Sequence, residues 1–283
     1  MNNGVFIGRL SLKHIKWFFL LGILVMGSTQ ANDLDKQLKA AAGEVKVITA
    51  TASELQLFKD QLIPAFTGAG PSNWQALAIQ QVNHADFITL QELPTAKQGR
   101  GFFAINTTPK NNWLLQAPHA DSDLYTGKIV SRLFLTGEFK AAQWNTVKRD
   151  VSDLAHTPNT YWQAFTQVFA EQYPDGKIIQ LHGYDEAVRR TAAGEASDMI
   201  LSAGHKAPPL WVQQTAACLK NAFPKQVSLY PFDVQELGGT TNVQGQLLGS
   251  LGHSGFLHIE MSKDMRKELL DNAAQRKLFI KCL

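Results

Sequence analysis

The chain has 283 residues, of which 45% are hydrophobic and 18% charged, a composition that excludes a disordered or fibrous chain and favours one globular domain. Its formal net charge is +3, but three of the 27 basic residues, Arg9, Lys13 and Lys16, lie within the first 31 positions. The remainder balances 24 basic residues (27 minus 3) against 24 acidic ones, and no cluster of basic and aromatic residues in it predicts a nucleic-acid partner.

The first 31 residues predict a secretory signal peptide. Basic residues come first, the apolar run 17–27 follows, and the stretch 28–31 offers a small residue at the cleavage position. The apolar run is too short to cross a bilayer comfortably. We therefore expect residues 1–31 to be removed and residues 32–283 to form a periplasmic or secreted domain without stable membrane insertion.

Short apolar strands alternate with amphipathic helices along the mature chain. Strands are expected at 45–50, 86–91, 101–106, 112–117, 177–182, 226–230 and 255–260, and helices from Thr126 onward, at 161–172, at 209–222 and at 263–275. Thr126 is expected to cap the first of these helices. No repeat or linker divides the chain, so we predict a single three-layer α/β domain, with a mostly parallel mixed sheet and helices on both faces.

Three of the predicted strands end in titratable side chains. His119 follows the fourth strand after a proline, His182 closes the fifth, and Glu260 closes the last. Ligands bind beyond the carboxyl ends of strands in open sheets of this kind, so the three side chains are expected to meet at one edge. Each also has a plainer interpretation: a loop histidine on the surface, a buried histidine bonded to a carbonyl group, and a glutamate paired with Arg266.

The surroundings of His119 favour a metal site. Asp121 and Asp123 follow it by two and four residues, just before a helix, and catalytic zinc takes imidazole nitrogen and carboxylate oxygen together. His119, His182 and one of these aspartates would leave a fourth position open for water, with Glu260 as general base. In the alternative interpretation, both aspartates only favour the helix N-terminus electrostatically.

Three short motifs resemble the carboxypeptidase-like zinc hydrolases, in particular the branch that contains poly-gamma-glutamate hydrolases and N-formylglutamate amidohydrolases. They are PHADSDLYTG at 118–127, LHG at 181–183 and GFLHIEMS at 255–262, in the same order as in that branch. The resemblance implies that His119, Asp123 and His182 bind one zinc ion and that Glu260 is the base. The branch has a glutamate where this chain has an aspartate, and the interval after the histidine is shorter here, which leaves Asp121 as a rival for Asp123.

A substrate carboxylate would suit the planar guanidinium group of Arg149 or of the pair Arg189 and Arg190. The resemblance, which covers roughly residues 45–275, implies that Arg149 and Asn145 hold this carboxylate or the developing oxyanion.

The sequence thus predicts an exported hydrolase, in which a water activated by zinc and deprotonated by Glu260 attacks an amide, gamma-glutamyl or peptide carbonyl next to a free carboxylate. Its substrate would be a small molecule, a peptide or polyglutamate. An exported binding module that kept the fold and lost turnover is the alternative, and a glutamate turned away from the metal would favour it. A serine hydrolase lacks support because the chain has no Gly-x-Ser-x-Gly sequence.

The chain has two cysteines, Cys218 and Cys282. In an oxidising compartment they can form a disulfide that ties the C-terminal tail to the body, and two buried thiols are the alternative. Without a Cys-x-x-Cys spacing, the sequence predicts neither a thiolate zinc site nor a redox motif.

Overall fold

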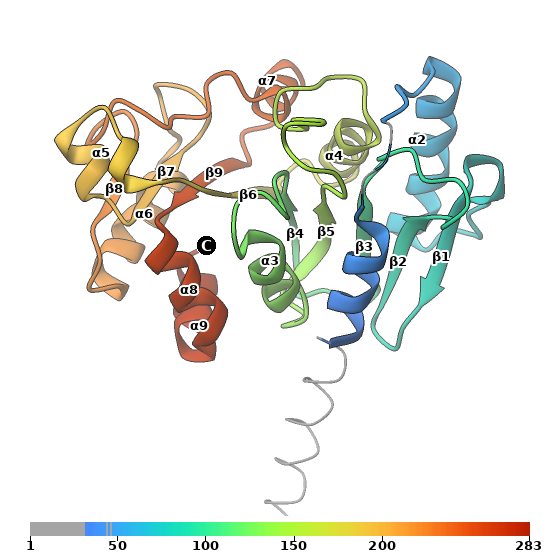
Figure 1. Cartoon of the computed structure of the whole chain (residues 1–283), viewed down its shortest axis with the longest axis horizontal. Coiled ribbons are helices and arrows are strands. Elements are labelled where there is room, and N and C mark those ends of the chain that lie inside the picture. Colours follow the sequence, from blue (N-terminus) through green and yellow to red (C-terminus); the bar gives the residue numbers. More distant parts are fainter. Residues whose placement is uncertain (1–31, 44, 46) are drawn as a thin grey trace, which may run out of the picture.

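The structure of the protein is a computed structural model that describes residues 32–43, 45 and 47–283 (Figure 1). The predicted signal peptide, residues 1–31, lies outside the described residues, so its cleavage and the export of the protein stay predictions. None of the helices in the described ranges is both long and apolar enough to cross a bilayer.

Strands and helices alternate along most of the described chain. The strands are β1 (Ile79–Asn83), β2 (Phe87–Glu92), β3 (Phe102–Asn106), β4 (Asn111–Ala117), β5 (Phe139–Trp144), β6 (Lys177–Gly183), β7 (Met199–Ser202), β8 (Val227–Leu229) and β9 (Phe256–Met261). The helices are α2 (Ala52–Thr67), α3 (Thr126–Phe134), α4 (Tyr161–Gln172), α5 (Ala192–Ala196), α6 (Leu210–Ala222), α7 (Val243–Ser250), α8 (Lys263–Asp271) and α9 (Ala273–Cys282). Residues 32–41 are also helical, and η1 (Gln75–Leu77) and η2 (Glu186–Val188) are short 3-10 helices.

The strands form one mixed sheet in the order β1-β2-β3-β5-β4-β6-β9-β7-β8. The central strands β5, β4, β6 and β9 run parallel. Strands β1, β2 and β3 pair antiparallel with their neighbours, as does β7 with β9. The predicted α/β class with a mixed sheet is confirmed, and its four parallel central strands all deliver their carboxyl ends to the same edge.

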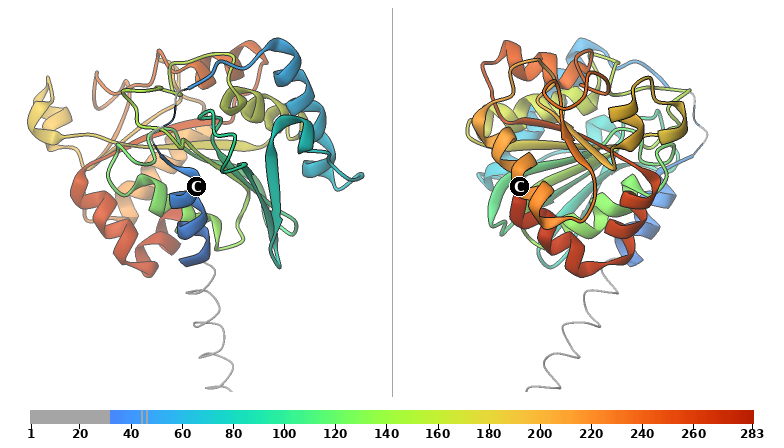
Figure 2. Two further views of the ribbon diagram at one scale, coloured as in Figure 1. Left: turned by 45° about the vertical axis from the view of Figure 1, so that its right-hand side comes forward. Right: turned by 90° about the vertical axis from the view of Figure 1, so that its left-hand side faces the viewer.

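Helices cover both faces of the sheet, as predicted (Figures 1 and 2). One face packs against residues 32–41, α3, α6, α8 and α9 in the larger apolar core. The other face packs against α2, α4 and α7 in a second core. Side chains alternate along a strand. Because the leucine, isoleucine and methionine of β9 belong to the first core, His258 and Glu260 point to the second face.

The strand expected at 45–50 is wrong for the residues that the structure describes there. Positions 47–50 form neither strand nor helix, and Ile48 is 48% exposed. The physical reason lies just downstream: Thr51 and Glu54 form a reciprocal capping box that starts α2. The short apolar run is therefore the entry to a helix that the sequence analysis did not identify.

Two helix boundaries also differ from the predictions. Helix α3 begins at Thr126, but Tyr125, with a φ of 78°, occupies the cap position. Thr126 does not cap because its hydroxyl donates back to the Asp123 carbonyl at 2.8 Å. The helix expected at 263–275 breaks at Asn272, whose extended backbone ends α8 and whose side chain accepts hydrogen bonds from the first turn of α9.

The two cysteines are joined. Cys218 in α6 and Cys282 at the end of α9 form a disulfide between Cα atoms 5.4 Å apart. Lys177 also bonds to the carbonyl oxygen of Leu283. Of the two alternatives from the sequence, the structure has the tie that holds the C-terminal tail to the body.

Candidate metal centre

His119 and Asp123 lie on one turn between β4 and α3. The Asp123 backbone N–H donates to the His119 carbonyl at 2.8 Å, and the Thr126 hydroxyl donates to the Asp123 carbonyl at 2.8 Å. The turn places the two buried side chains together, with His119 Nδ1 3.2 Å from Asp123 Oδ2.

His182 joins them from the end of β6, the strand beside β4. Its Nδ1 lies 3.2 Å from His119 Nδ1 and 3.7 Å from Asp123 Oδ2. The candidate ligand atoms of these three buried residues all lie within 4.8 Å of one another. The structure therefore brings the three predicted ligands together, whereas Asp121 is exposed and lines a different pocket.

The outer nitrogen of each histidine is held by an acceptor. His119 Nε2 lies 2.9 Å from Asp153 Oδ1, and His182 Nε2 lies 2.7 Å from Gln180 Oε1. A carboxylate oxygen and an amide oxygen only accept, so each Nε2 carries a proton. In the neutral rings both Nδ1 lone pairs then face each other and the carboxylate of Asp123.

Three acceptors that converge in this way fit a cation. Their separations are 3.2, 3.2 and 3.7 Å. In a tetrahedral zinc site with bonds of about 2.0–2.1 Å, neighbouring ligand atoms lie roughly 3.4 Å apart. Two imidazole nitrogens with one carboxylate oxygen also form a donor set that zinc takes in catalytic sites. The residues present therefore fit a zinc ion.

The charges of the cluster favour a cation as well. Burial would raise the pKa of Asp123, but the adjacent imidazole groups of His119 and His182 outweigh it and hold this pKa well below its usual range. Burial likewise opposes ionisation of Asp153, yet its hydrogen bond with His119 lowers the pKa to about 2. Both carboxyl groups are therefore charged at neutral pH.

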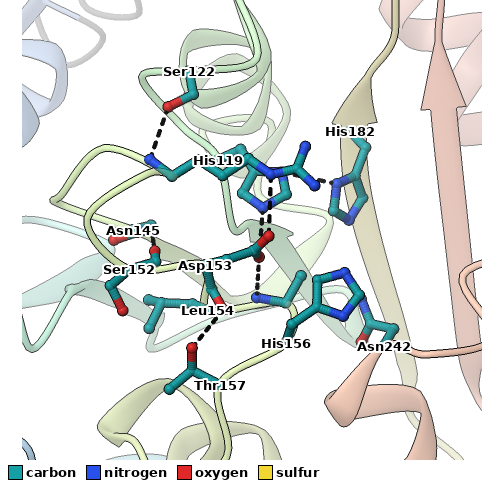
Figure 3. A network of polar contacts seen from close by, with 12 residues as sticks. His119, Ser122, Asn145, Ser152, Asp153, Leu154, His156, Thr157, His182 and Asn242 are labelled. Carbon is teal, nitrogen blue, oxygen red and sulfur yellow. Dashed lines mark hydrogen bonds and ion pairs between the residues drawn. The ribbon is translucent and has the colours of Figure 1, made fainter.

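Asp153 is a site residue that the sequence analysis missed. It lies on the loop after β5, where one of its oxygens bonds to His119 Nε2 (Figure 3). Its other oxygen bonds to Arg149 Nε at 3.1 Å. A carboxylate behind a ligating histidine orients the ring and raises its basicity. The only sequence signal is that Asp153 stands four residues after Arg149, a spacing that any surface ion pair on a helix would also have.

Glu260 faces the same site from β9. It is the register partner of His182, and both line a pocket of about 300 Å³. Glu260 Oε1 lies 3.7 Å from His258 Nε2, and Oε2 has no hydrogen-bond partner among the described residues. Burial raises the pKa of Glu260, and the nearby His182 only partly offsets this.

Arg266, the alternative partner of Glu260, packs elsewhere. Its guanidinium group lies against Gly183, where a Cβ atom would stand 1.2 Å from Arg266 Nη1, and it reaches the Tyr184 carbonyl at 3.5 Å. The absence of a side chain at Gly183 therefore makes room for this arginine. The Gly183 backbone N–H also donates to Asp123 Oδ2 at 2.9 Å.

Of the predicted substrate-binding residues, the structure brings Arg149 to this pocket, with 49% of its side chain exposed. Asn145 is buried, holds its own loop through hydrogen bonds to main-chain groups, and lines a different pocket. Arg189 stacks over the ring of Tyr184 at 5.4 Å and is not among the residues that line the site.

A loop before α7 supplies the opposite wall of the pocket, residues 237–242. His156 joins this wall to the loop after β5, because its Nδ1 donates to the Thr241 carbonyl at 3.1 Å. Nothing in the local sequence marks His156 or this wall as part of a site, so neither was predicted from the sequence.

No family model and no curated protein matches the sequence. Among solved structures, the chain is similar to a gene product from Agrobacterium tumefaciens (11% identity, TM-score 0.47, 62% of this chain and 90% of that one). It is also similar to N-formylglutamate amidohydrolase from Ralstonia eutropha (11%, 0.43, 65% and 95%) and to a bacteriophage poly-gamma-glutamate hydrolase (10%, 0.34, 64% and 85%). The last two carry the names of the branch that the sequence motifs resemble. At these identities the likeness concerns the fold alone.

Proposed function

We propose that the protein is an exported zinc-dependent hydrolase that cleaves an amide, gamma-glutamyl or peptide bond next to a free carboxylate. The observation that carries this proposal is the convergence of His119 Nδ1, His182 Nδ1 and Asp123 Oδ2. The two histidines also line a pocket together with Glu260. Zinc bound by these three residues would polarise a substrate carbonyl and lower the pKa of a bound water.

Glu260 would serve as the general base. Its raised pKa lies closer to neutral pH, where a general base works best. Strand β9 holds it in register with His182, and its Oε2 atom, which has no partner among the described residues, is available to take a proton and pass it to the leaving nitrogen. Because Glu260 lines the pocket, its position speaks for turnover rather than for a binding module.

Arg149 would hold the free carboxylate of the substrate. It bonds to Asp153 through Nε, and its two terminal nitrogens have no hydrogen-bond partner in the described part of the chain. A carboxylate can bind such a pair of nitrogens in a bidentate manner. The pocket, about 300 Å³, lies at the small end of ligand sites and suits a substrate group of amino-acid size.

Metal content and hydrolysis should be measured together on the parent protein, Glu260→Gln and Glu268→Gln. Glu268 lies on α8, 4.0 Å from Lys225, and is a control for the same change of charge outside the pocket. We expect about one zinc per chain in all three proteins. The parent and Glu268→Gln should hydrolyse an N-acyl amino acid or a gamma-glutamyl peptide, and Glu260→Gln should not.

Two outcomes would contradict the proposal. A Glu260→Gln protein as active as the parent would reject this base. A parent that binds zinc and hydrolyses neither class of substrate would instead support the binding module.

Export is tested separately, by N-terminal sequencing of the protein from its native cell. The proposed signal peptide predicts a mature chain that begins near residue 32 outside the cytoplasm. An intact N-terminus on cytoplasmic protein would contradict it.

A further inference from the structure

The side-chain amide of Gln180 lies at the centre of a buried chain of hydrogen bonds. Its Oε1 accepts from His182 Nε2 at 2.7 Å and from Asn242 Nδ2, and its Nε2 donates to Gln116 Oε1 at 2.8 Å. The most exposed of these four residues has 4% of its surface accessible. Because water hardly competes here, the orientation of each amide depends on its protein partners.

Asn242 fixes the direction of this chain at one end. It is the N-cap of α7, and its Oδ1 accepts from the backbone N–H groups of Gln244 and Gly245 at 3.0 and 3.3 Å. The amide nitrogen of Asn242 therefore faces Gln180. Since an amide nitrogen only donates, Gln180 has to present its oxygen.

Thr166 favours the same direction at the other end. Its hydroxyl donates to the Trp162 carbonyl within α4 at 3.0 Å and accepts from Gln116 Nε2 at 2.9 Å. The nitrogen of Gln116 thus faces the helix, and its oxygen faces Gln180. Two separate helix contacts, one in α4 and one at the start of α7, agree on the orientation of the Gln180 amide.

We propose that the chain Asn242, Gln180, Gln116 and Thr166 sets the tautomer of His182 and thereby the affinity of the site for zinc. This inference rests on the proposed function, because it concerns the same ligand. With the Gln180 oxygen facing it, His182 carries its proton on Nε2 and directs the Nδ1 lone pair at His119 and Asp123. A reversed amide would favour a proton on Nδ1, where it competes with the cation. Gln180 and Asn242 are therefore positioning residues.

Asn242→Asp tests the direction without removing the helix cap. Aspartate caps a helix about as well as asparagine but offers no donor when ionised, so the Gln180 amide should turn its nitrogen toward residue 242. We expect zinc affinity, measured by competition with a chelator, to fall about 10- to 100-fold, the usual loss for a partner behind a ligand.

Gln180→Met and Gln180→Glu test the acceptor itself. Methionine removes the acceptor for His182 Nε2 and should lower zinc affinity to a similar extent. Glutamate keeps an acceptor at that position, so Gln180→Glu should bind zinc more tightly than Gln180→Met. If Gln180 had only a structural role, Gln180→Glu and Gln180→Met would bind zinc with the same affinity, although only glutamate keeps an oxygen.

Gln143→Met is the matched control. Gln143 is also fully buried and donates to Thr166 at 3.1 Å, but it does not bond to Gln180. We expect this variant to bind zinc as the parent does. If the loss of any buried glutamine lowered zinc affinity, Gln143→Met and Gln180→Met would lower it equally.

Imidazole nitrogen NMR of the metal-free protein reads the tautomer directly, at a pH where the ring is neutral. His182 should carry its proton on Nε2 in the parent and shift toward Nδ1 in Asn242→Asp. A parent with the proton on Nδ1 would overturn the inference, and so would zinc affinities of Asn242→Asp and Gln180→Met equal to that of Gln143→Met. Neither readout involves a substrate, so this failure is distinct from a parent that binds zinc and does not hydrolyse.

Discussion

The two histidines of the candidate metal centre are held from behind in contrasting ways. Behind His119 is Asp153, a charged loop residue with 26% of its side chain exposed that also binds Arg149. Behind His182 is Gln180, a neutral and fully buried residue within the sheet. A carboxylate adds basicity and responds to nearby charge, whereas a buried amide fixes orientation alone. One half of the site is therefore exposed to charges that bind near Arg149, and the other half is set by the fold.

The largest effect should come from removing the carboxylate of Asp123, the proposed zinc ligand that lies beside both histidines. Asp123→Asn is expected to abolish stoichiometric zinc binding, a loss greater than the roughly 10- to 100-fold change typical of a partner behind a ligand. Zinc retained after dialysis measures this. Asp121→Asn is the matched control and should keep its zinc, because Asp121 is exposed and faces another pocket. The reverse result would make Asp121 the ligand.

A smaller effect should distinguish the two residues behind the histidines. Asp153→Asn and Gln180→Met are both expected to lower zinc affinity by about 10- to 100-fold. Asp153→Asn should also raise the KM of an acidic substrate measured at saturating zinc, because Arg149 loses the anchor at its Nε. Gln180→Met should leave that KM unchanged. Equal changes of KM in both variants would contradict a substrate role for Arg149.

The loss of stability at low pH should also distinguish Asp153 from Gln180. The pKa of Asp153 in the folded protein is about 2, below the unfolded value of about 3.9. A carboxyl group with a lowered pKa stabilises the fold above the unfolded pKa, and this contribution is lost as the pH falls through the folded one. Denaturant titrations of the metal-free protein should therefore show a smaller loss of stability from about pH 4 to pH 2 in Asp153→Asn than in the parent. Gln180→Met should lose as much stability over this pH range as the parent does, since Gln180 carries no charge.

The smallest effect on the metal centre is expected from removal of the disulfide. Cys218 and Cys282 are 64 residues apart in sequence, and a crosslink over such a loop contributes about 4 kcal/mol to stability in the chain-entropy account. The double variant Cys218→Ser with Cys282→Ser should lower the free energy of unfolding by an amount of that order and leave zinc affinity as in the parent. A large loss of zinc affinity would show that the C-terminal tie also positions the site.

The sequence was sufficient to predict the residues at the ends of the central strands. His119, His182 and Glu260 each follow an apolar run that reads as a strand, and parallel strands bring their carboxyl ends to one edge. It was not sufficient for β1, β5 and β7, which the sequence analysis did not identify. The stretch FKAAQW of β5 mixes polar and small residues, and β7 has only four residues, so neither carries a clear period.

The residues behind the ligands depend on three-dimensional pairing that no local pattern reveals. Gln116 and Gln180 meet because they are register partners of β4 and β6, and this register is visible only in the assembled sheet. Asp153 meets His119 across 34 positions of sequence. Asn145 shows the converse: the resemblance implies a substrate-binding role for it, and it directly follows β5, yet it lines another pocket.

The most direct test of the metal centre is anomalous diffraction from crystals of the zinc-loaded protein. We predict a single zinc ion per chain, bonded to Nδ1 of His119, Nδ1 of His182 and a carboxylate oxygen of Asp123. Zinc bonded through either Nε2 atom, or held by His258 and Glu260 instead, would contradict it.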